Sequence, residues 1–226
     1  MQLTVRDVSK LMSVSERTVY RWIKQKSIPV YKVLDQYRFN KAELLDWALS
    51  RRISVHSNFF QTKESEELVL PNLSEAIKIG GIYYRVCVKD KTAALKRIVE
   101  LLRLPEEIDK DFLTQLLCAR EEIASTGVGD GIAIPHVRNP IVLNVPFSMV
   151  ALCFFEKPID FGAMDGKPVH CAFVVISQTV RVHLHLLSCI AFALNDKEFK
   201  QSILKQGSRE SIESNLSKVE KRLKRK

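Results

Sequence analysis

The sequence predicts an α/β (α+β) protein in two parts, a small helical module with a two-stranded wing and a larger body in which helices flank a mixed sheet. Its 226 residues exceed the commonest domain size of about 100–150 residues. Short helical periods fill residues 1–52, whereas the later chain mixes helical periods with buried strand-like runs. A polar stretch separates the two. We therefore expect domains at 1–52 and 68–217, a linker at 53–67 and a basic tail at 218–226.

The net charge of +9 is concentrated at the two ends of the chain. Residues 1–52 contain 11 Lys and Arg against 5 Asp and Glu, and residues 218–226 contain 6 against 1, which leaves a net charge of −2 for residues 53–217. Charge segregated in this way suggests a nucleic-acid module rather than general attraction to polyanions, but basic ends are also common on proteins that bind no nucleic acid. The tail could add contacts to DNA or could simply keep a C-terminal helix soluble.

Neither export nor a membrane span is indicated. No apolar run approaches the roughly 18 residues that a span requires, and the N-terminus has no apolar signal core, so we expect a cytoplasmic protein. The cysteine number is odd and no CxxC spacing occurs, which favours core thiols over disulfides or a zinc site. They are Cys87, Cys118, Cys153, Cys171 and Cys189. We expect neither a metal nor a cofactor.

The first residues have the pattern of two short helices joined by a tight turn. Thr4 and Asp7 have the spacing of a capping box, and apolar residues follow at helical spacing. Ser13 with Glu16, or Ser15 alone, can cap the second helix. The outer face of that helix carries Arg17, Thr18, Tyr20, Arg21 and Lys24. In a helix-turn-helix of this kind, the second helix enters the major groove.

The following segment predicts a wing. Alternating runs at 30–33 and 37–39 flank "LDQ" and can pair as two strands, and Asn40 can cap a third helix. Residues 1–52 as a whole resemble the excisionase or MerR-type winged helix-turn-helix family. The resemblance implies DNA binding through the face of the second helix, with Lys32 and Arg38 of the wing contacting phosphates. Because one such module makes few base contacts, we expect a homodimer or cooperative binding.

The body alternates between helical and strand-like segments. Helical periods occur at 91–102, 110–123, 182–194 and 197–206, and apolar runs at 147–155 and 170–177 read as buried strands. Helices interspersed with buried strands predict an α/β sandwich with a mixed sheet.

A single histidine, His136, closes a short strand-like run after the glycine-rich "GVGDG". Metal binding is disfavoured, because His183 and His185 are two residues apart on a predicted helix and do not share a face. No GxSxG elbow or nucleotide P-loop motif is present. Taken alone, His136 could equally be a structural histidine at a strand end.

Its surroundings carry a more specific signal. The segment "REEIASTGVGDGIAIPHVR", residues 120–138, resembles the signature of the enzyme IIA domain of the bacterial phosphoenolpyruvate-dependent sugar phosphotransferase system, of the mannitol, fructose and nitrogen-related type. The resemblance extends over residues 68–206. It implies a mixed sheet flanked by helices, His136 as a transient phosphoryl acceptor, and Arg120 and His183 beside it. His185 is then a structural residue.

The expected chemistry is that of an activated imidazole. A neutral imidazole nitrogen is a competent nucleophile near pH 7, and backbone N–H groups of Gly127, Gly129 and Gly131 could cradle phosphate oxygens. We expect Pro135 to hold His136 in place and leave its ring open to a partner. The Asp130 carboxylate would oppose an incoming phosphoryl group unless it points away.

Together these features predict a transcription regulator linked to the phosphotransferase system. DNA and an HPr-like phosphocarrier protein are the expected partners, and the IIA-like body would act as a phosphocarrier rather than as a turnover enzyme. Two alternatives stay open: a sugar phosphocarrier that passes phosphate to a transporter component, and a regulator that binds other proteins according to its phosphorylation state.

Overall fold

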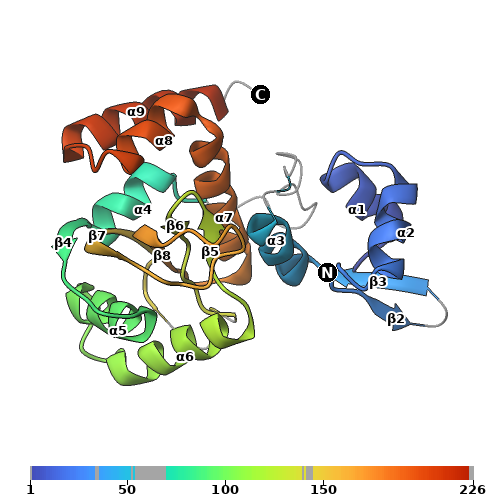
Figure 1. Ribbon diagram of the computed structural model, residues 1–226, viewed down its shortest axis with the longest axis horizontal. Coiled ribbons are helices and arrows are strands. Elements are labelled where there is room, and N and C mark those ends of the chain that lie inside the picture. The colour runs from blue at the N-terminus through green and yellow to red at the C-terminus, as the bar shows by residue number, and fades with distance from the viewer. Residues whose placement is uncertain are drawn as a thin grey trace. The chain divides into compact units, whose positions relative to one another are not determined.

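A computed structural model describes residues 2–33, 36–51, 53, 70–138, 140 and 145–223. The chain divides into two compact units, residues 1–68 and 69–226 (Figure 1). The tip of the predicted wing at 34–35, residues 54–67 of the predicted linker and residues 224–226 of the predicted tail lie outside the described residues. Within the described part of the chain, no helix combines the length and apolar character needed to cross a bilayer.

The smaller unit is built from three helices and a small antiparallel sheet among its described residues. In chain order its elements are β1 (Gln2–Leu3), α1 (Val5–Leu11), α2 (Glu16–Lys24), β2 (Tyr31–Val33), β3 (Gln36–Asn40) and α3 (Lys41–Ser50). The pairing of β2 with β3 confirms the predicted wing. β1 adds a third strand on the other side of β3. This strand was not predicted, because a run of two residues has no recognisable pattern.

Local hydrogen bonds explain where the first two helices begin. The Thr4 hydroxyl accepts from the Asp7 amide at 3.3 Å, and the Asp7 carboxylate accepts from the Thr4 amide at 2.9 Å, which confirms the capping box. The hydrogen bonds from Thr4 hold the pKa of Asp7 below its ordinary value. For α2, Ser15 is the capping residue and accepts from the Thr18 amide at 3.2 Å.

The core of the smaller unit joins its helices to the wing. Its fully buried side chains include Val8, Val19, Phe39, Leu44 and Leu45. The Trp22 and Trp47 rings meet edge to face with centroids 5.0 Å apart, and both are half-buried. An edge-to-face aromatic pair contributes stability beyond the area that it buries, so both tryptophans serve packing.

The larger unit contains a mixed sheet of five strands, in the order β4-β7-β8-β6-β5. Its strands are β4 (Ile82–Val86), β5 (Gly127–Gly129), β6 (Ile132–Ala133), β7 (Met149–Ile159) and β8 (Val169–Ile176). Its helices are α4 (Leu73–Gly80), α5 (Lys91–Leu101), α6 (Lys110–Ile123), α7 (Val180–Asn195), α8 (Lys197–Leu204) and α9 (Arg209–Leu223). The predicted helices and the strands β7 and β8 are confirmed, whereas α4, β4 and α9 had not been predicted.

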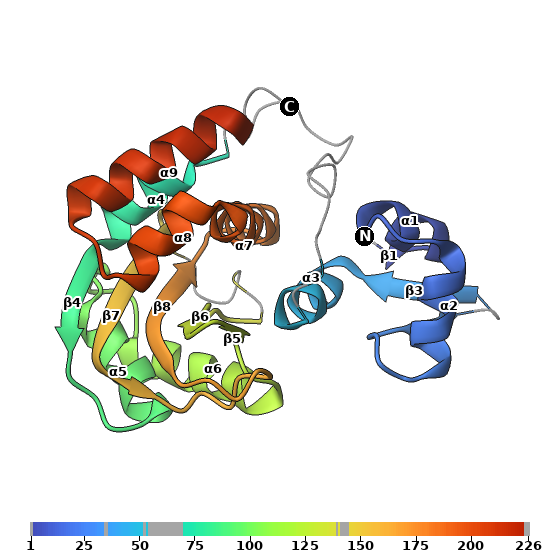
Figure 2. The same cartoon turned by 45° about the horizontal axis from the view of Figure 1, so that its top comes forward.

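The helices form two layers around this sheet. Helices α5 and α6 cover one face, and α4, α7, α8 and α9 cover the other (Figures 1 and 2). The central strands β7 and β8 are almost continuously buried, because helices on both faces require near-continuous apolar sequence rather than alternation. This explains why these two strands were readable from the sequence.

The last helix corrects the predicted boundary of the body. Residues 218–223, assigned to a basic tail, belong to α9. Val219 is buried, and the Glu220 carboxylate accepts from the amide of Ser74 at 2.8 Å and from its hydroxyl at 2.7 Å. These residues are therefore part of the packed domain.

The prediction of core thiols holds for two cysteines and is wrong for one. Cys153 and Cys171 are fully buried, and burial raises the pKa of both thiols, that of Cys153 to about 12. Cys118 and Cys189 are half-buried. Cys87 is exposed and lines a groove of about 810 Å³ beside α5. Of its two apolar neighbours in sequence, Val86 is the last residue of the edge strand β4 and Val88 lies beyond it.

Candidate functional site

His136 lies on the continuation of β6 along β8. It forms a parallel bridge with Val175, and the Val175 amide donates to the Pro135 carbonyl at 3.0 Å. The same register joins Ile132 and Ala133 of β6 to β8. Strand pairing therefore sets the position of His136.

The environment of the ring determines which nitrogen of His136 carries the proton in the neutral form. Nδ1 of His136 lies 2.8 Å from the carbonyl oxygen of Ile134. A carbonyl oxygen can only accept, so Nδ1 carries the proton and Nε2 carries the lone pair in the neutral ring. The side chain is only 3% exposed. The expectation of an open ring is therefore wrong, because a residue paired to a central strand is enclosed by the fold.

His183 is the second histidine of the site. It lies in the first turn of α7, a helix capped by Thr179. Its ring centroid lies 5.2 Å from that of His136, with the ring planes inclined at 52°. His183 is 3% exposed, and its Nδ1 lies 3.1 Å from the hydroxyl oxygen of Ser177. The structure thus brings together two histidines that are far apart in sequence.

Arg120 is anchored at the same end of the β5–β6 hairpin as His136. It occupies the last turn of α6, is 8% exposed, and donates from Nη1 to the Ala124 carbonyl at 2.8 Å. The Ile134 amide donates to the Thr126 carbonyl. Because the two strands are antiparallel, the chain that leads back from Thr126 to Ala124 and the chain that leads on from Ile134 to His136 leave this bond at the same end of the hairpin. A guanidinium buried at this end provides a positive charge that solvent screens only weakly.

The predicted glycine cradle does not surround the histidine. Gly129 pairs with Ile132, so the turn through Gly131 closes the hairpin at the end opposite His136. His136 lies four residues after Ile132 along extended chain, a distance of about 13 Å. Gly127 pairs with Ala133, between the two ends. The expectation that Gly129 and Gly131 bind a phosphoryl group on His136 does not fit this geometry.

These glycines instead permit close packing. A Cβ atom on Gly127 would lie 2.7 Å from the Cβ of Ala163, and one on Gly131 would lie 2.4 Å from the His170 ring. The backbone φ is +89° at Gly129 and +74° at Gly131, a region that side chains disfavour. A tight turn against a neighbouring segment thus accounts for the glycine-rich motif.

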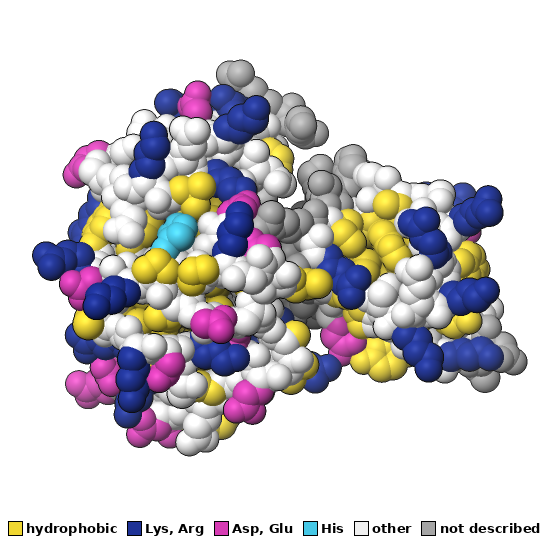
Figure 3. All heavy atoms as spheres, viewed as in Figure 1, with side chains coloured by type: hydrophobic (Ala, Val, Ile, Leu, Met, Phe, Trp, Pro, Cys, Tyr) yellow, Lys and Arg dark blue, Asp and Glu magenta, His cyan; other side chains and the backbone are white. Residues whose placement is uncertain are grey.

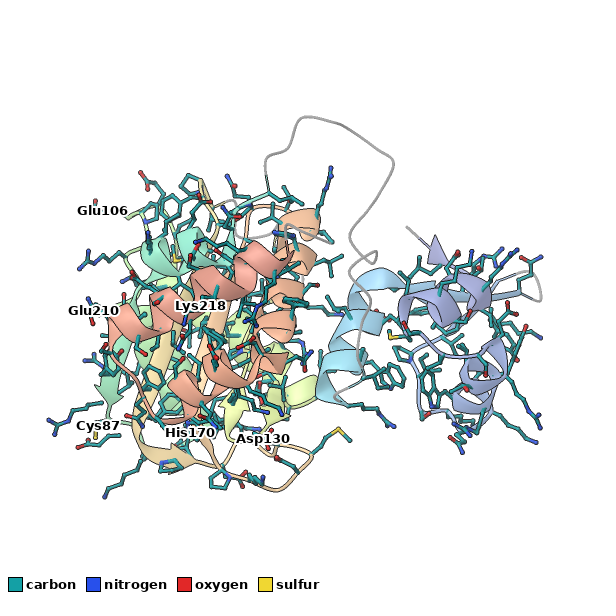
Figure 4. The ribbon with its side chains drawn as sticks, turned by 90° about the horizontal axis from the view of Figure 1, so that it is seen from above. Cys87, Glu106, Asp130, His170, Glu210 and Lys218 are labelled. Carbon is teal, nitrogen blue, oxygen red and sulfur yellow. The ribbon has the colours of Figure 1, made fainter. Side chains whose placement is uncertain are left out.

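The carboxylate of Asp130 is neutralised by two lysines. It accepts from Lys200 at 2.6 Å and from Lys167 at 3.3 Å. Figure 4 shows Asp130 and His170 at one edge of the larger unit. Since the turn lies at the end of the hairpin remote from His136, Asp130 does not present its charge to that ring.

The remaining histidine of α7 ties the helix to the chain before α4. His185 Nε2 lies 3.1 Å from the Pro71 carbonyl oxygen, and burial lowers the pKa of His185 below its ordinary value. The sulfur of Cys189 lies 3.6 Å from the same nitrogen. Across the described residues, no group of three or more metal-binding side chains occurs.

The face predicted to bind DNA is largely exposed in the smaller unit. Five of its seven side chains are exposed, namely Arg17, Tyr20, Arg21, Lys24 and Lys32. Thr18 and Arg38 are half-buried: the Thr18 hydroxyl bonds that of Ser15, and Arg38 donates to the Tyr37 carbonyl and to Gln36. On the side seen in Figure 3, Lys and Arg side chains of this unit clearly outnumber Asp and Glu.

One site residue, Ser177, was missed by sequence reasoning. It follows β8 and contacts the His183 ring. A serine after an apolar strand is common and belongs to no motif, so only the fold reveals that it lies against a histidine six residues later.

Comparisons with known proteins agree with this architecture. Residues 3–52 match a helix-turn-helix domain model. A nitrogen regulatory protein of Pseudomonas aeruginosa is 32% identical over 151 residues, which is 65% of this chain and 90% of that protein. A fructose-specific EIIA component of Haloferax volcanii is 32% identical over 113 residues, which is 49% of this chain and 71% of that protein.

Solved structures show the same fold. The crystal structure of the nitrogen regulatory protein IIA-Ntr from Neisseria meningitidis superposes with a TM-score of 0.53 at 28% identity, covering 61% of this chain and 94% of that one. Residues 75–219 match the model of the EIIA 2 component of the phosphoenolpyruvate-dependent sugar phosphotransferase system. The chain therefore belongs to the phosphotransferase system EIIA 2 family, with a helix-turn-helix domain at its N-terminal end.

Proposed function

We propose that this protein is a transcription regulator that accepts a phosphoryl group on His136 and binds DNA through its N-terminal module. The donor is a phosphohistidine on an HPr-like carrier protein. One observation carries the proposal: the Nδ1 of His136 is engaged by a backbone carbonyl while the His183 ring lies 5.2 Å away. This arrangement supports an imidazole whose Nε2 is the reactive atom.

The transfer step follows from that tautomer. The lone pair of His136 Nε2 attacks the phosphorus, and the phosphorus–nitrogen bond to the donor histidine breaks. The electron pair of that bond returns to the donor ring, and the proton on Nδ1 of His136 stays in its hydrogen bond to Ile134. No proton needs to leave the acceptor before attack.

Positive and hydrogen-bonding groups of the site would stabilise the charge that develops during transfer. Phosphoryl transfer spreads negative charge over three equatorial oxygens, which positive and hydrogen-bonding groups stabilise. His183 and the buried Arg120 are the candidates, and the N-terminus of α7, near His183, adds the positive end of a helix dipole. Since His136 is 3% exposed, we expect the residues that enclose its ring to move when the carrier docks.

The experiment for this step is transfer of labelled phosphate from the phosphorylated carrier. We expect the wild-type chain to take up acid-labile label and His136→Ala to take up none. His170→Ala is the matched control, because His170 packs beside Gly131 at the other end of the hairpin, and it should label normally. Equal labelling of His136→Ala would contradict the proposal.

The DNA-binding part of the proposal is supported by the helix-turn-helix match and by the exposed basic face of α2. After selection of a binding site at fixed salt, we expect Arg17→Ala with Arg21→Ala to weaken binding and to reduce the slope of log affinity against log salt by about 2. Lys89→Ala with Lys96→Ala, the same charge change in the larger unit, should bind as wild type. Unchanged affinity in the α2 variant would contradict DNA binding through this face. The same assay over a concentration series tests the proposed homodimer or cooperative binding.

A sugar phosphocarrier is the second candidate, and one observation favours it. A relative that matches this chain is named a fructose-specific EIIA component. In that case the phosphorylated chain should pass its label to a transporter B component and should show no preference among DNA sequences.

The third candidate is a regulator that binds other proteins according to its phosphorylation state, and the name nitrogen regulatory protein among the relatives is compatible with it. Defined candidate partners should then bind wild-type and His136→Ala protein differently after treatment with the carrier, with no dependence on DNA.

A further inference from the structure

Ser177 is a buried hydroxyl group placed against the second histidine of the site. It lies between β8 and α7, is 0% exposed, and its Oγ is 3.1 Å from Nδ1 of His183. Two residues earlier on the same chain, Val175 forms the bridge that positions His136. The chain thus contacts both histidines over three residues, through the backbone of Val175 near the end of β8 and through the side chain of Ser177 just after it.

The burial of Ser177 decides the direction of this hydrogen bond. A buried hydroxyl is expected to donate its hydrogen, because an unsatisfied donor away from water carries a desolvation penalty. Among the described residues, the contact with His183 Nδ1 is the one hydrogen bond of the Ser177 side chain. Ser177 therefore donates, and Nδ1 of His183 accepts. In the neutral ring the proton of His183 is then on Nε2.

We propose that Ser177 is a positioning residue that sets the tautomer of His183 and makes its Nε2–H a donor to the phosphoryl group on His136. This rests on the proposed phosphoryl acceptance. The two histidines are then complementary: His136 has its proton on Nδ1 and attacks with Nε2, whereas His183 has its proton on Nε2 and donates it in a hydrogen bond. The opposite tautomer of His183 would direct a lone pair at the phosphoryl oxygens and repel them.

The assignment has a direct spectroscopic test. In two-bond ¹H–¹⁵N spectra of the full chain near neutral pH, we expect wild-type His183 to show a protonated Nε2 and an unprotonated Nδ1. Ser177→Ala should convert this to a mixture of tautomers, and Ser177→Thr, which keeps the hydroxyl, should restore the wild-type pattern. A proton on Nδ1 in the wild type, or an unchanged tautomer in Ser177→Ala, overturns the proposal.

The kinetic consequence is measured separately. We expect Ser177→Ala to slow label transfer from the phosphorylated carrier by roughly tenfold, about the effect of one hydrogen bond in a transition state, with Ser177→Thr close to wild type. Ser148→Ala is the matched control, because Ser148 is also buried and its hydroxyl accepts from the Gln178 amide at 3.1 Å, with no contact to a histidine recorded among the described residues. Transfer by Ser177→Ala at the wild-type rate overturns the positioning role.

The two experiments distinguish failure of this inference from failure of the proposed function. A wild-type chain that takes no label overturns phosphoryl acceptance, and the role assigned to Ser177 in transfer falls with it. A wild-type chain that takes label while His183 shows the opposite tautomer leaves the proposed function standing and overturns the role of Ser177 alone.

Discussion

Gly131 shows how strongly one position in the β5–β6 turn is constrained. Its φ of +74° lies in a region that L-residues rarely adopt, and a Cβ atom there would lie 2.4 Å from the His170 ring. Gly166 has a similar φ of +67°, but a Cβ atom there would have nothing within 4 Å. Substitutions at these two glycines can therefore distinguish the energetic cost of backbone strain from that of a steric clash.

We predict that Gly166→Ala lowers the free energy of unfolding by about 1 kcal/mol, the cost of a left-handed conformation. Gly131→Ala should cost at least about 3 kcal/mol, because a clash with the His170 ring adds to the strain. Urea titrations followed by circular dichroism measure both. Equal costs would show that the His170 ring moves aside freely.

Two histidines are predicted to make stability depend on pH. Burial lowers the pKa of His170 and of His185 below the ordinary value of 6.5. The unfolded chain therefore binds more protons than the folded chain as the pH falls below 6.5, so stability present above that pH is lost below it. We expect the unfolding free energy to fall between pH 6.5 and 5, and His170→Gln to reduce that slope. A slope unchanged by His170→Gln would contradict the contribution of His170.

At the scale of elements, α9 is fastened to α4 by a charged contact. The Glu220 carboxylate accepts two hydrogen bonds from Ser74, which lies at the second position of α4. A carboxylate at a helix N-terminus satisfies free amide groups and interacts favourably with the helix dipole. The end of the chain is thereby coupled to the first helix of the larger unit.

This contact predicts different effects for two truncations. Removal of residues 218–226 deletes the buried Val219 together with Glu220 and should lower the unfolding free energy of the larger unit by about 2–4 kcal/mol. Removal of residues 224–226 alone should have little effect. Thermal unfolding of both proteins measures the difference. Equal stability would restore the interpretation of residues 218–226 as a tail.

At the scale of the whole molecule, each of the two units has a buried core of its own. Val19 in the smaller unit and Phe173 in the larger one are both 0% exposed. The net charge also differs between the two parts of the chain: it is +6 for residues 1–52 and −2 for residues 53–217. The helix-turn-helix unit and the EIIA unit can therefore be altered one at a time.

We predict separate unfolding transitions for the two units in urea. Val19→Ala should shift only the transition of the smaller unit, by about 1–3 kcal/mol, and Phe173→Ala only that of the larger unit, by about 3–5 kcal/mol. Tryptophan fluorescence reports the smaller unit, because both tryptophans, Trp22 and Trp47, lie in it. Far-ultraviolet circular dichroism reports mainly the larger unit. A shift of both transitions by either substitution would contradict independent cores.

Much of the fold was predictable because its signals are local. Capping pairs such as Thr4 with Asp7 act within one turn of helix, and the buried runs of β7 and β8 are long enough to identify without their neighbours. Short elements were not predictable. β1 has two residues and exists only by pairing with β3, and the buried positions of α9, Ile212, Leu216 and Val219, lie among charged residues that have the composition of a basic tail.

The candidate site divides in the same way. The family signature indicated His136, Arg120 and His183 by number, whereas the chemistry expected of a glycine-rich turn and of Pro135 suggested a glycine cradle and an open ring. The register of β6 on β8 places the glycine turn at the other end of the hairpin and encloses the ring. The contact between Ser177 and His183 likewise depends on how β8 leads into α7.

The amino-acid order alone was sufficient to indicate two domains, most of their helices and the histidine of interest, because periodicity, caps and motifs act over a few neighbouring residues. Tertiary structure alone decided which nitrogen of the neutral His136 ring carries the proton, how buried that ring is and which side chain contacts His183. These properties arise from strand register and from contacts between segments that are distant in sequence. The direction of a hydrogen bond and the exclusion of water depend on those contacts, so they are determined only in the folded protein.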